Sequence, residues 1–129
     1  MPLKVELVSV ERLIWSGEAD MIIARTTEGE LGVMPGHTPV LGQLSDELGI
    51  VQIHRSGESN LIAAVHGGFL SVTSKGVSIL AETAELASEI DVERARRALD
   101  RAKDGSSEDE VAAAARANAR LTAASLSTS

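Results

Sequence analysis

The sequence contains no cysteine, two aromatic residues and three prolines among 129 residues. Without cysteine the chain can form no disulfide, thiolate zinc site or iron–sulfur cluster. The two aromatic residues, Trp15 and Phe69, provide no stacking platform for single-stranded nucleic acid. Basic residues are also scarce, 12 against 19 acidic ones, which gives a net charge of −7 and no basic cluster for phosphate backbones. We therefore expect no nucleic-acid partner.

Long apolar runs are missing as well. No segment approaches the roughly 18 uncharged apolar residues that cross a bilayer, and the N-terminus lacks the basic and apolar segments of a signal peptide. We expect no direct membrane insertion, so that the chain meets a membrane through partners. The length predicts one domain, or one small domain with an appendage.

The composition changes near Ala87. Residues 1–87 contain both aromatic residues, all three prolines and ten of the eleven glycines, with 5 basic and 11 acidic residues. Residues 88–129 contain eleven alanines and one glycine, with 7 basic and 8 acidic residues. Turn-forming and β-branched residues dominate the first part, whereas helix formers dominate the second. We predict two domains, residues 1–87 and residues 88–129.

Short strands are predicted throughout the first domain. Residues 4–10 alternate apolar and polar side chains, as in a strand with one buried face. Similar runs follow, separated by turn-forming residues such as Pro35-Gly36 and Ser74–Gly76. They cover residues 13–15, 21–24, 31–34, 50–54, 61–65, 69–73 and 77–81. This spacing predicts an all-β N-terminal domain, an antiparallel sandwich or barrel.

Two helices are predicted after the strands. Residues 92–103 are helix formers without strand alternation, preceded by the N-cap residue Asp91 and followed by Gly105. Ser107 and Glu110 form a capping box for a second helix that runs to about Ala124. The short connection predicts an antiparallel C-terminal α-helical hairpin.

The second predicted helix has a thin apolar face. Between Val111 and Ala124 its large apolar residue is Leu121, and most other positions are alanine. Such a helix forms by propensity but buries little apolar surface, so we expect it to dock weakly. The pattern fits both a mobile element and a loose tail.

The residues do not indicate an autonomous enzyme. His37, His54 and His66 lie on separate predicted turns or strands, without carboxylates or cysteines at metal-ligand spacing. The chain has no nucleophile elbow and no P-loop, and Gly67-Gly68 is more typical of a tight strand crossing or bulge. We predict that the chain is not catalytic alone and holds no metal.

Four arginines are spaced so that they can meet on one side of the hairpin. Arg94 and Arg101 are two turns apart on one helix, and Arg116 and Arg120 are one turn apart on the other. In an antiparallel hairpin the guanidinium groups can converge near a triphosphate, with Asp91 accepting a hydrogen bond from a base or ribose. An ordinary solvated face is the simpler interpretation of the same spacing, and both stay open here.

Three segments resemble the epsilon subunit of F-type ATP synthase. Residues 29–40 are similar to the family's glycine-containing segment that ends in Pro-Gly-His-x-Pro. Residues 65–72 resemble its V-x-G-G-F strand, and residues 90–95 fit its I/L-D-x-x-R-A motif. Together with the order and length of the two domains, the resemblance covers essentially the whole chain. The first two motifs are specific, whereas the third is also simply a good helix start.

The resemblance implies a β-sandwich that sits on the rotor and contacts the gamma subunit of the central stalk and the membrane ring of c subunits. It also implies a hairpin that lies folded on the sandwich or extends along the stalk. In some members the extended form hinders ATP hydrolysis at the catalytic beta subunit, and in some the folded form binds ATP. We therefore expect a non-catalytic rotor subunit, peripheral on the cytoplasmic side of the cell membrane, that couples proton-driven rotation to ATP synthesis.

The resemblance also supplies a candidate ATP site, with ATP as a regulatory ligand and no required cofactor. Four of its positions fill the family motif and four match the flanking positions. They are Ile90, Asp91, Arg94 and Ala95 in the motif, and Glu85, Arg101, Arg116 and Arg120 around it. The second helix has fewer basic residues than the resemblance leads us to expect of a helix that binds an acidic segment of the catalytic beta subunit. The alternative from another class is a free-standing nucleotide-sensing binding module.

Overall fold

The computed structural model describes residues 3–45, 49–55, 57–102 and 107–127. Within these ranges eight strands precede a short 3₁₀ helix and two α-helices. The strands are β1 (Leu3–Ser9), β2 (Leu13–Ala19), β3 (Met21–Thr26), β4 (Gly29–Val33), β5 (Val40–Gln43), β6 (Ile50–His54), β7 (Leu61–Thr73) and β8 (Gly76–Leu86). The helices are η1 (Ala87–Glu89), α1 (Val92–Ala102) and α2 (Glu108–Ser127).

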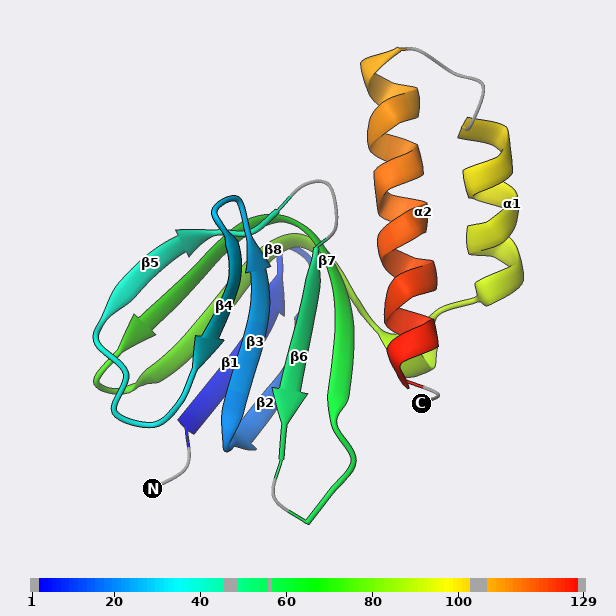
Figure 1. Cartoon of the computed structure of the whole chain (residues 1–129). Helices are drawn as coiled ribbons and strands as arrows, with labels where there is room; N and C mark the ends of the chain where they lie inside the picture. The colour runs from blue at the N-terminus through cyan, green and yellow to red at the C-terminus, as the bar shows by residue number, and fades with distance from the viewer. Residues whose placement is uncertain (1–2, 46–48, 56, 103–106, 128–129) are drawn as a thin grey trace.

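The strands form the predicted β-sandwich, followed by the predicted helices (Figure 1). The strand order is β2-β1-β8-β7-β6-β3-β4, and β5 pairs with β7 outside this path. Among the described strands the pairs are antiparallel except β1 and β8, which run parallel. The fold class is therefore confirmed, and the parallel pair is a feature that residue alternation within single strands does not reveal.

Two predicted strands are one long strand in the structure, and one strand was missed. The runs at 61–65 and 69–73 belong to β7, which pairs first with β6 and then, beyond Gly67-Gly68, with β5. The strand β5 is four residues long and exposed at three of them, so it lacks the apolar alternation that predicts a strand. Hydrogen bonding to β7 decides its conformation instead.

The core of the sandwich consists of aliphatic side chains at alternate strand positions. In β1 the burial alternates from Leu3 to Ser9, which places Val5 and Leu7 inside. The largest fully buried side chains come from six different segments of the domain. They are Leu7, Ile22, Leu44, Ile53, Leu70 and Ile79.

Both helices begin with the caps that the sequence predicts. The Asp91 carboxylate accepts a 3.0 Å hydrogen bond from the backbone N–H of Arg94, and the Ser107 hydroxyl oxygen accepts one of 3.2 Å from the N–H of Glu110. The second helix extends to Ser127, three residues beyond the predicted end at Ala124. The predicted stop at Gly105 lies outside the described residues.

The hairpin packs on the sandwich through α2, which lies between the sandwich and α1 (Figure 1). Ala119 and Ala123 are fully buried in this contact. Their small side chains allow the helix to approach the sheet closely. The partners come from β6, β7, η1 and the link before α1: Ile50, Ile62, Ala64, Ala87 and Ile90. No helix in the described part of the chain is long and apolar enough to cross a membrane.

Candidate functional site

A pocket of about 400 Å³ opens where the hairpin meets the end of β8. It is bounded by the C-terminal part of β8, by η1, and by facing sides of α1 and α2. Its lining is Glu85, Glu89, Asp91, Arg94, Ala95, Ala98, Arg101 and Arg120. Six of the eight predicted ATP-site residues are thus brought together: Glu85, Asp91, Arg94, Ala95, Arg101 and Arg120.

The start of α1 fixes one side of the pocket. Asp91 caps this helix with one carboxylate oxygen and its backbone carbonyl, which accepts a 3.0 Å hydrogen bond from the N–H of Ala95. The cap holds Asp91 and Arg94 one turn apart at the helix N-terminus, and both residues line the pocket. The dipole at this end of α1 favours negative charge nearby.

An ion pair between the two domains also lines the pocket. The guanidinium Nε of Arg120 on α2 donates to Oε1 of Glu85 on β8 at 2.5 Å. The two side chains are 28% and 34% exposed, respectively, so the pair is partly shielded from water. An incoming phosphate must therefore compete with Glu85 for the Arg120 guanidinium.

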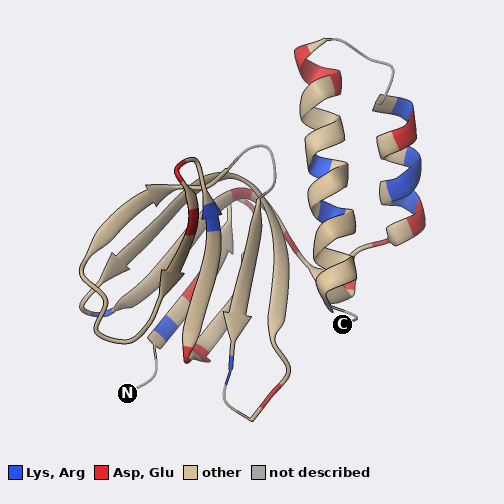
Figure 2. Ribbon diagram, in the orientation of Figure 1, with Lys and Arg blue, Asp and Glu red and all other residues tan. Residues whose placement is uncertain are grey.

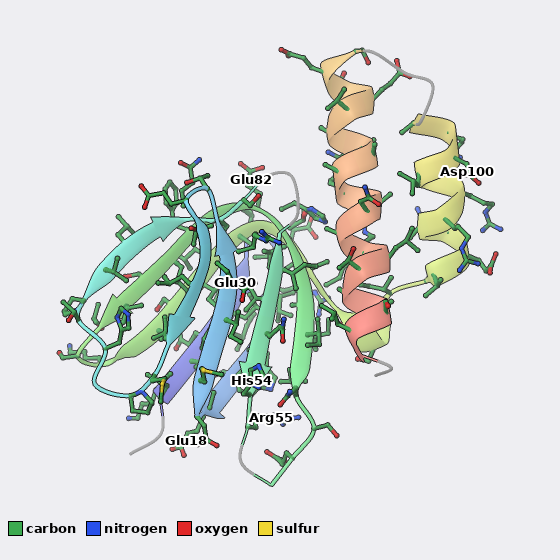
Figure 3. The ribbon with its side chains drawn as sticks, in the orientation of Figure 1. Glu18, Glu30, His54, Arg55, Glu82 and Asp100 are labelled. Carbon is green, nitrogen blue, oxygen red and sulfur yellow. The ribbon has the colours of Figure 1, made fainter. Side chains whose placement is uncertain are left out.

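The charges in the pocket balance. Three arginines and three carboxylates line it, and Figure 2 shows the basic residues gathered on the two helices beside acidic ones. Asp100 on α1 points away from α2 into solvent (Figure 3). The pocket can attract an anion through Arg94 and Arg101, and it gains net positive charge when Glu85 is displaced or neutralised.

Two predicted site residues lie elsewhere. Ile90 packs against the apolar contact between α2 and the sandwich, and Arg116 is exposed on α2 outside the pocket lining. The sequence interpretation missed Glu89 and Ala98. Helical spacing could have indicated Ala98, which lies one turn beyond Ala95. Glu89 lies in η1, and residue spacing does not predict where this short helix lies.

His66 lies under α2 and was not assigned to any site from the sequence. It is 9% exposed, and its Nε2 is buried without a hydrogen-bond partner in the described part of the chain. The pKa of His66 is lowered to about 4, chiefly by burial and then by the positive charges of Arg120 and Arg116, against the opposing effect of Glu85. The imidazole is therefore neutral at pH 7.

The described residues contain no group of three or more His, Cys, Asp or Glu side chains that could hold a metal ion. His37 is half-buried in the turn after β4, where its Nδ1 lies 2.7 Å from the carbonyl oxygen of Thr38. His54 lies at the end of β6, beside Arg55 (Figure 3). The three histidines thus occupy separate places in the fold.

The protein is thus a small β-sandwich joined to a helical hairpin, with a polar pocket where the two meet. A family model described as the ATP synthase delta/epsilon chain beta-sandwich domain matches residues 2–87. The ATP synthase epsilon chain of Streptomyces griseus is 56% identical over 121 residues, which are 94% of this chain and 94% of that protein. The epsilon chain of Rhodococcus jostii is 62% identical over 95 residues, or 74% of this chain and 77% of that protein. The chain belongs to the epsilon-chain family of F-type ATP synthase.

Solved structures agree with this family. A chain of the Euglena gracilis mitochondrial ATP synthase, in a structure of its OSCP, F1 and c-ring, matches with a TM-score of 0.77 and 26% identity. The match covers 97% of this chain and 81% of that chain. A chain of the central stalk and c-ring of the Tetrahymena thermophila enzyme shares the fold, with a TM-score of 0.59 and 16% identity.

Proposed function

We propose that this chain is a non-catalytic rotor subunit that couples proton-driven rotation to ATP synthesis. The observation that carries the proposal is the 56% identity to an epsilon chain over 94% of both proteins. The likeness to a chain in the Euglena assembly of F1 and c-ring supports a place beside the ring. In this role the chain is peripheral, on the cytoplasmic side of the cell membrane.

An exposed apolar row on the sandwich supports docking on a rotor partner. Strand pairing aligns Leu13, Val8, Leu80 and Phe69 across β2, β1, β8 and β7. Leu13, Leu80 and Phe69 are each at least 50% exposed. Isolated exposed apolar residues are ordinary, but an aligned row is typical of a protein interface. We assign this docking row to the gamma subunit.

The end of the sandwich offers a second contact surface. The turn at residues 35–39 and the turn at residues 73–76 line one broad, open pocket. Proline at two positions of the first turn restricts its backbone, which suits a fixed contact. We assign this end to the ring of c subunits.

Recovery of partners from detergent-solubilised membranes tests the rotor assignment. Tagged wild-type chain should recover the gamma subunit and the c ring. Leu80→Asp, which places a charge in the docking row, should lose gamma, whereas Val111→Asp on the exposed side of α2 should retain it. A wild-type chain recovered without any synthase subunit would contradict the proposal.

The hairpin is the candidate regulatory element. It is attached through alanine contacts and the Glu85–Arg120 ion pair, so its release needs little apolar surface to be exposed. In the released form the hairpin would reach the catalytic beta subunit and hinder ATP hydrolysis. ATP bound in the junction pocket would hold the hairpin folded.

Calorimetric titration with ATP tests the nucleotide site. Binding heat is expected for the wild-type chain, and Arg94→Ala and Arg120→Ala should weaken or abolish it, because both arginines line the pocket. Arg96→Ala, which removes an exposed arginine outside the lining, should retain binding. Absence of heat with the wild-type chain rejects the site. Binding by a chain that recovers no synthase subunits would instead favour the free-standing nucleotide-sensing module.

A further inference from the structure

His66 lies in the contact between the sandwich and the hairpin. Side chains at alternate positions of a strand point to the same face, so Ile62, Ala64 and His66 of β7 form one row. The first two pack against Ala119 and Ala123 of α2. The row therefore continues from an apolar contact to a buried imidazole beneath the same helix.

The surroundings of His66 disfavour a positive charge. The helix α2 contributes Arg116 and Arg120, and β8 contributes Glu85, which is already paired with Arg120. The apolar cluster that contains its strand neighbours Ile62 and Ala64 adds Ile50 from β6 and Ala87 from η1, which are uncharged. Because Nε2 of His66 has no hydrogen-bond partner among the described residues, a proton added there would be buried without an acceptor from them and would be opposed by the positive charges of Arg120 and Arg116.

We propose that His66 is an acid-sensitive latch for the hairpin. The hairpin stays docked while the imidazole is neutral, and protonation of the ring releases α2 from the sandwich. Release moves Arg116 and Arg120 away from the new charge and exposes the ring to water. The latch itself depends only on the docked arrangement, whereas its effect on ATP hydrolysis rests on the inhibitory role proposed for the hairpin.

The direction of the pH effect follows from proton linkage. The pKa of His66 is about 4 in the docked state and returns toward its ordinary 6.5 when the hairpin is released. The docked state therefore binds fewer protons, so docking weakens as the pH falls below 6.5 and loses the whole contribution near pH 4. Between about pH 7.5 and about pH 5, the equilibrium constant for undocking should rise roughly 30-fold.

Energy transfer within the full-length chain measures this release. The sequence has no cysteine, so Glu28→Cys and Ala112→Cys, both at exposed positions, introduce a specific dye pair across the two domains. Transfer from the docked state should decline as the pH is lowered to about 5, and it should recover on neutralisation. In His66→Gln, which cannot take up the proton, the decline should disappear.

Matched variants separate His66 from other titrating groups. His54→Gln removes a histidine outside the hairpin contact and should keep the pH response. Glu85→Gln should loosen docking at every pH and keep the response of His66. Identical pH responses in wild type and His66→Gln, or unchanged transfer down to pH 5 in the wild type, would overturn the latch.

A proton NMR titration of the His66 imidazole in the unlabelled chain gives a second, independent result. The His66 ring should titrate well below the ordinary histidine value of about 6.5, because burial and the two arginines lower its pKa. Titration of the His66 ring near pH 6.5 would overturn the proposal. If the latch is confirmed while the assembled synthase shows no pH-dependent inhibition, the inhibitory role of the hairpin fails and the latch remains.

Discussion

Gly68 lies on β7 where the backbone of β8 leaves no room for a side chain. Its φ is +117°, a conformation that favours glycine. A Cβ added there would lie 1.9 Å from the carbonyl oxygen of Leu80 and 2.7 Å from the Cα of Ala81. The close strand approach predicted at Gly67-Gly68 is thus present, and it allows one strand to pair with β6 at one end and β5 at the other.

Gly68→Ala should therefore destabilise the sandwich strongly. Both the unfavourable φ and the backbone clash oppose the methyl group, so the free energy of unfolding should fall by about 3 kcal/mol or more. Urea unfolding followed by Trp15 fluorescence measures this change. Gly32→Ala is the matched control, because nothing lies within 4 Å of its added Cβ, and it should change the free energy by less than about 0.5 kcal/mol. Equal effects of the two substitutions would contradict the steric explanation.

The candidate site shows what sequence spacing can and cannot predict about single residues. Asp91 and Arg94 were found because the cap and the helical period place them together. Arg116 and Arg120 are one turn apart, yet only Arg120 lines the pocket, because the alanine contact with β7 fixes the rotation of α2. The burial of His66 likewise follows from this docking, which no local pattern encodes.

At the scale of elements, the helices were predicted more fully than the strands. Helix α1 is bounded by an N-cap and built from strong helix formers, so local chemistry decides where it begins. The strands β5 and β7 depend on distant partners: β5 is short and exposed, and β7 continues through two glycines. The parallel pairing of β1 with β8 joins opposite ends of the first domain, and non-local contacts alone decide it.

The cap of α2 provides a prediction at this scale. The Ser107 hydroxyl accepts from the N–H of Glu110 and lies 3.0 Å from its carboxylate, to which it donates. Ser107→Ala removes both bonds and should lower the stability of α2 by about 1 kcal/mol. Faster amide hydrogen exchange in the first turn of α2, measured in the full-length chain, would record the loss. Ser107→Asp retains an acceptor and should preserve protection, and equal exchange in Ser107→Ala and wild type would show that the cap contributes nothing.

At the scale of the whole molecule, the core of the sandwich and its contact with the hairpin differ in the size of their side chains. The sandwich has a continuous core of large aliphatic side chains, whereas α2 contacts it mainly through alanines. The thin apolar face of α2 predicts weak docking, and the side chains that α2 contributes to the contact are indeed small. A regulatory hairpin requires a stable domain on which it docks and a contact from which it can separate.

Ala119→Glu should release the hairpin from the sandwich. A carboxylate at this fully buried position would face apolar residues of β7 and cost about 3–5 kcal/mol, more than the small contact can offset. Trypsin should then cut at Arg116 and Arg120 faster than in wild type, while Trp15 fluorescence reports an intact sandwich. Ala112→Glu, at an exposed position of the same helix, should leave the cleavage rate unchanged. Slow cleavage of Ala119→Glu would show that docking tolerates the charge.

In the assembled synthase, release and removal of the hairpin should have opposite effects on ATP hydrolysis. Ala119→Glu favours the released hairpin and should lower the hydrolysis rate, because the free hairpin is then more often available to the catalytic subunit. Deletion from Ser107 onward removes α2 and should raise the rate without impairing assembly, since the docking row on the sandwich is untouched. Hydrolysis by detergent-solubilised enzyme, with subunit recovery as the control for assembly, measures both. A hairpin that only stabilises the sandwich would instead make the two variants change the rate in the same direction.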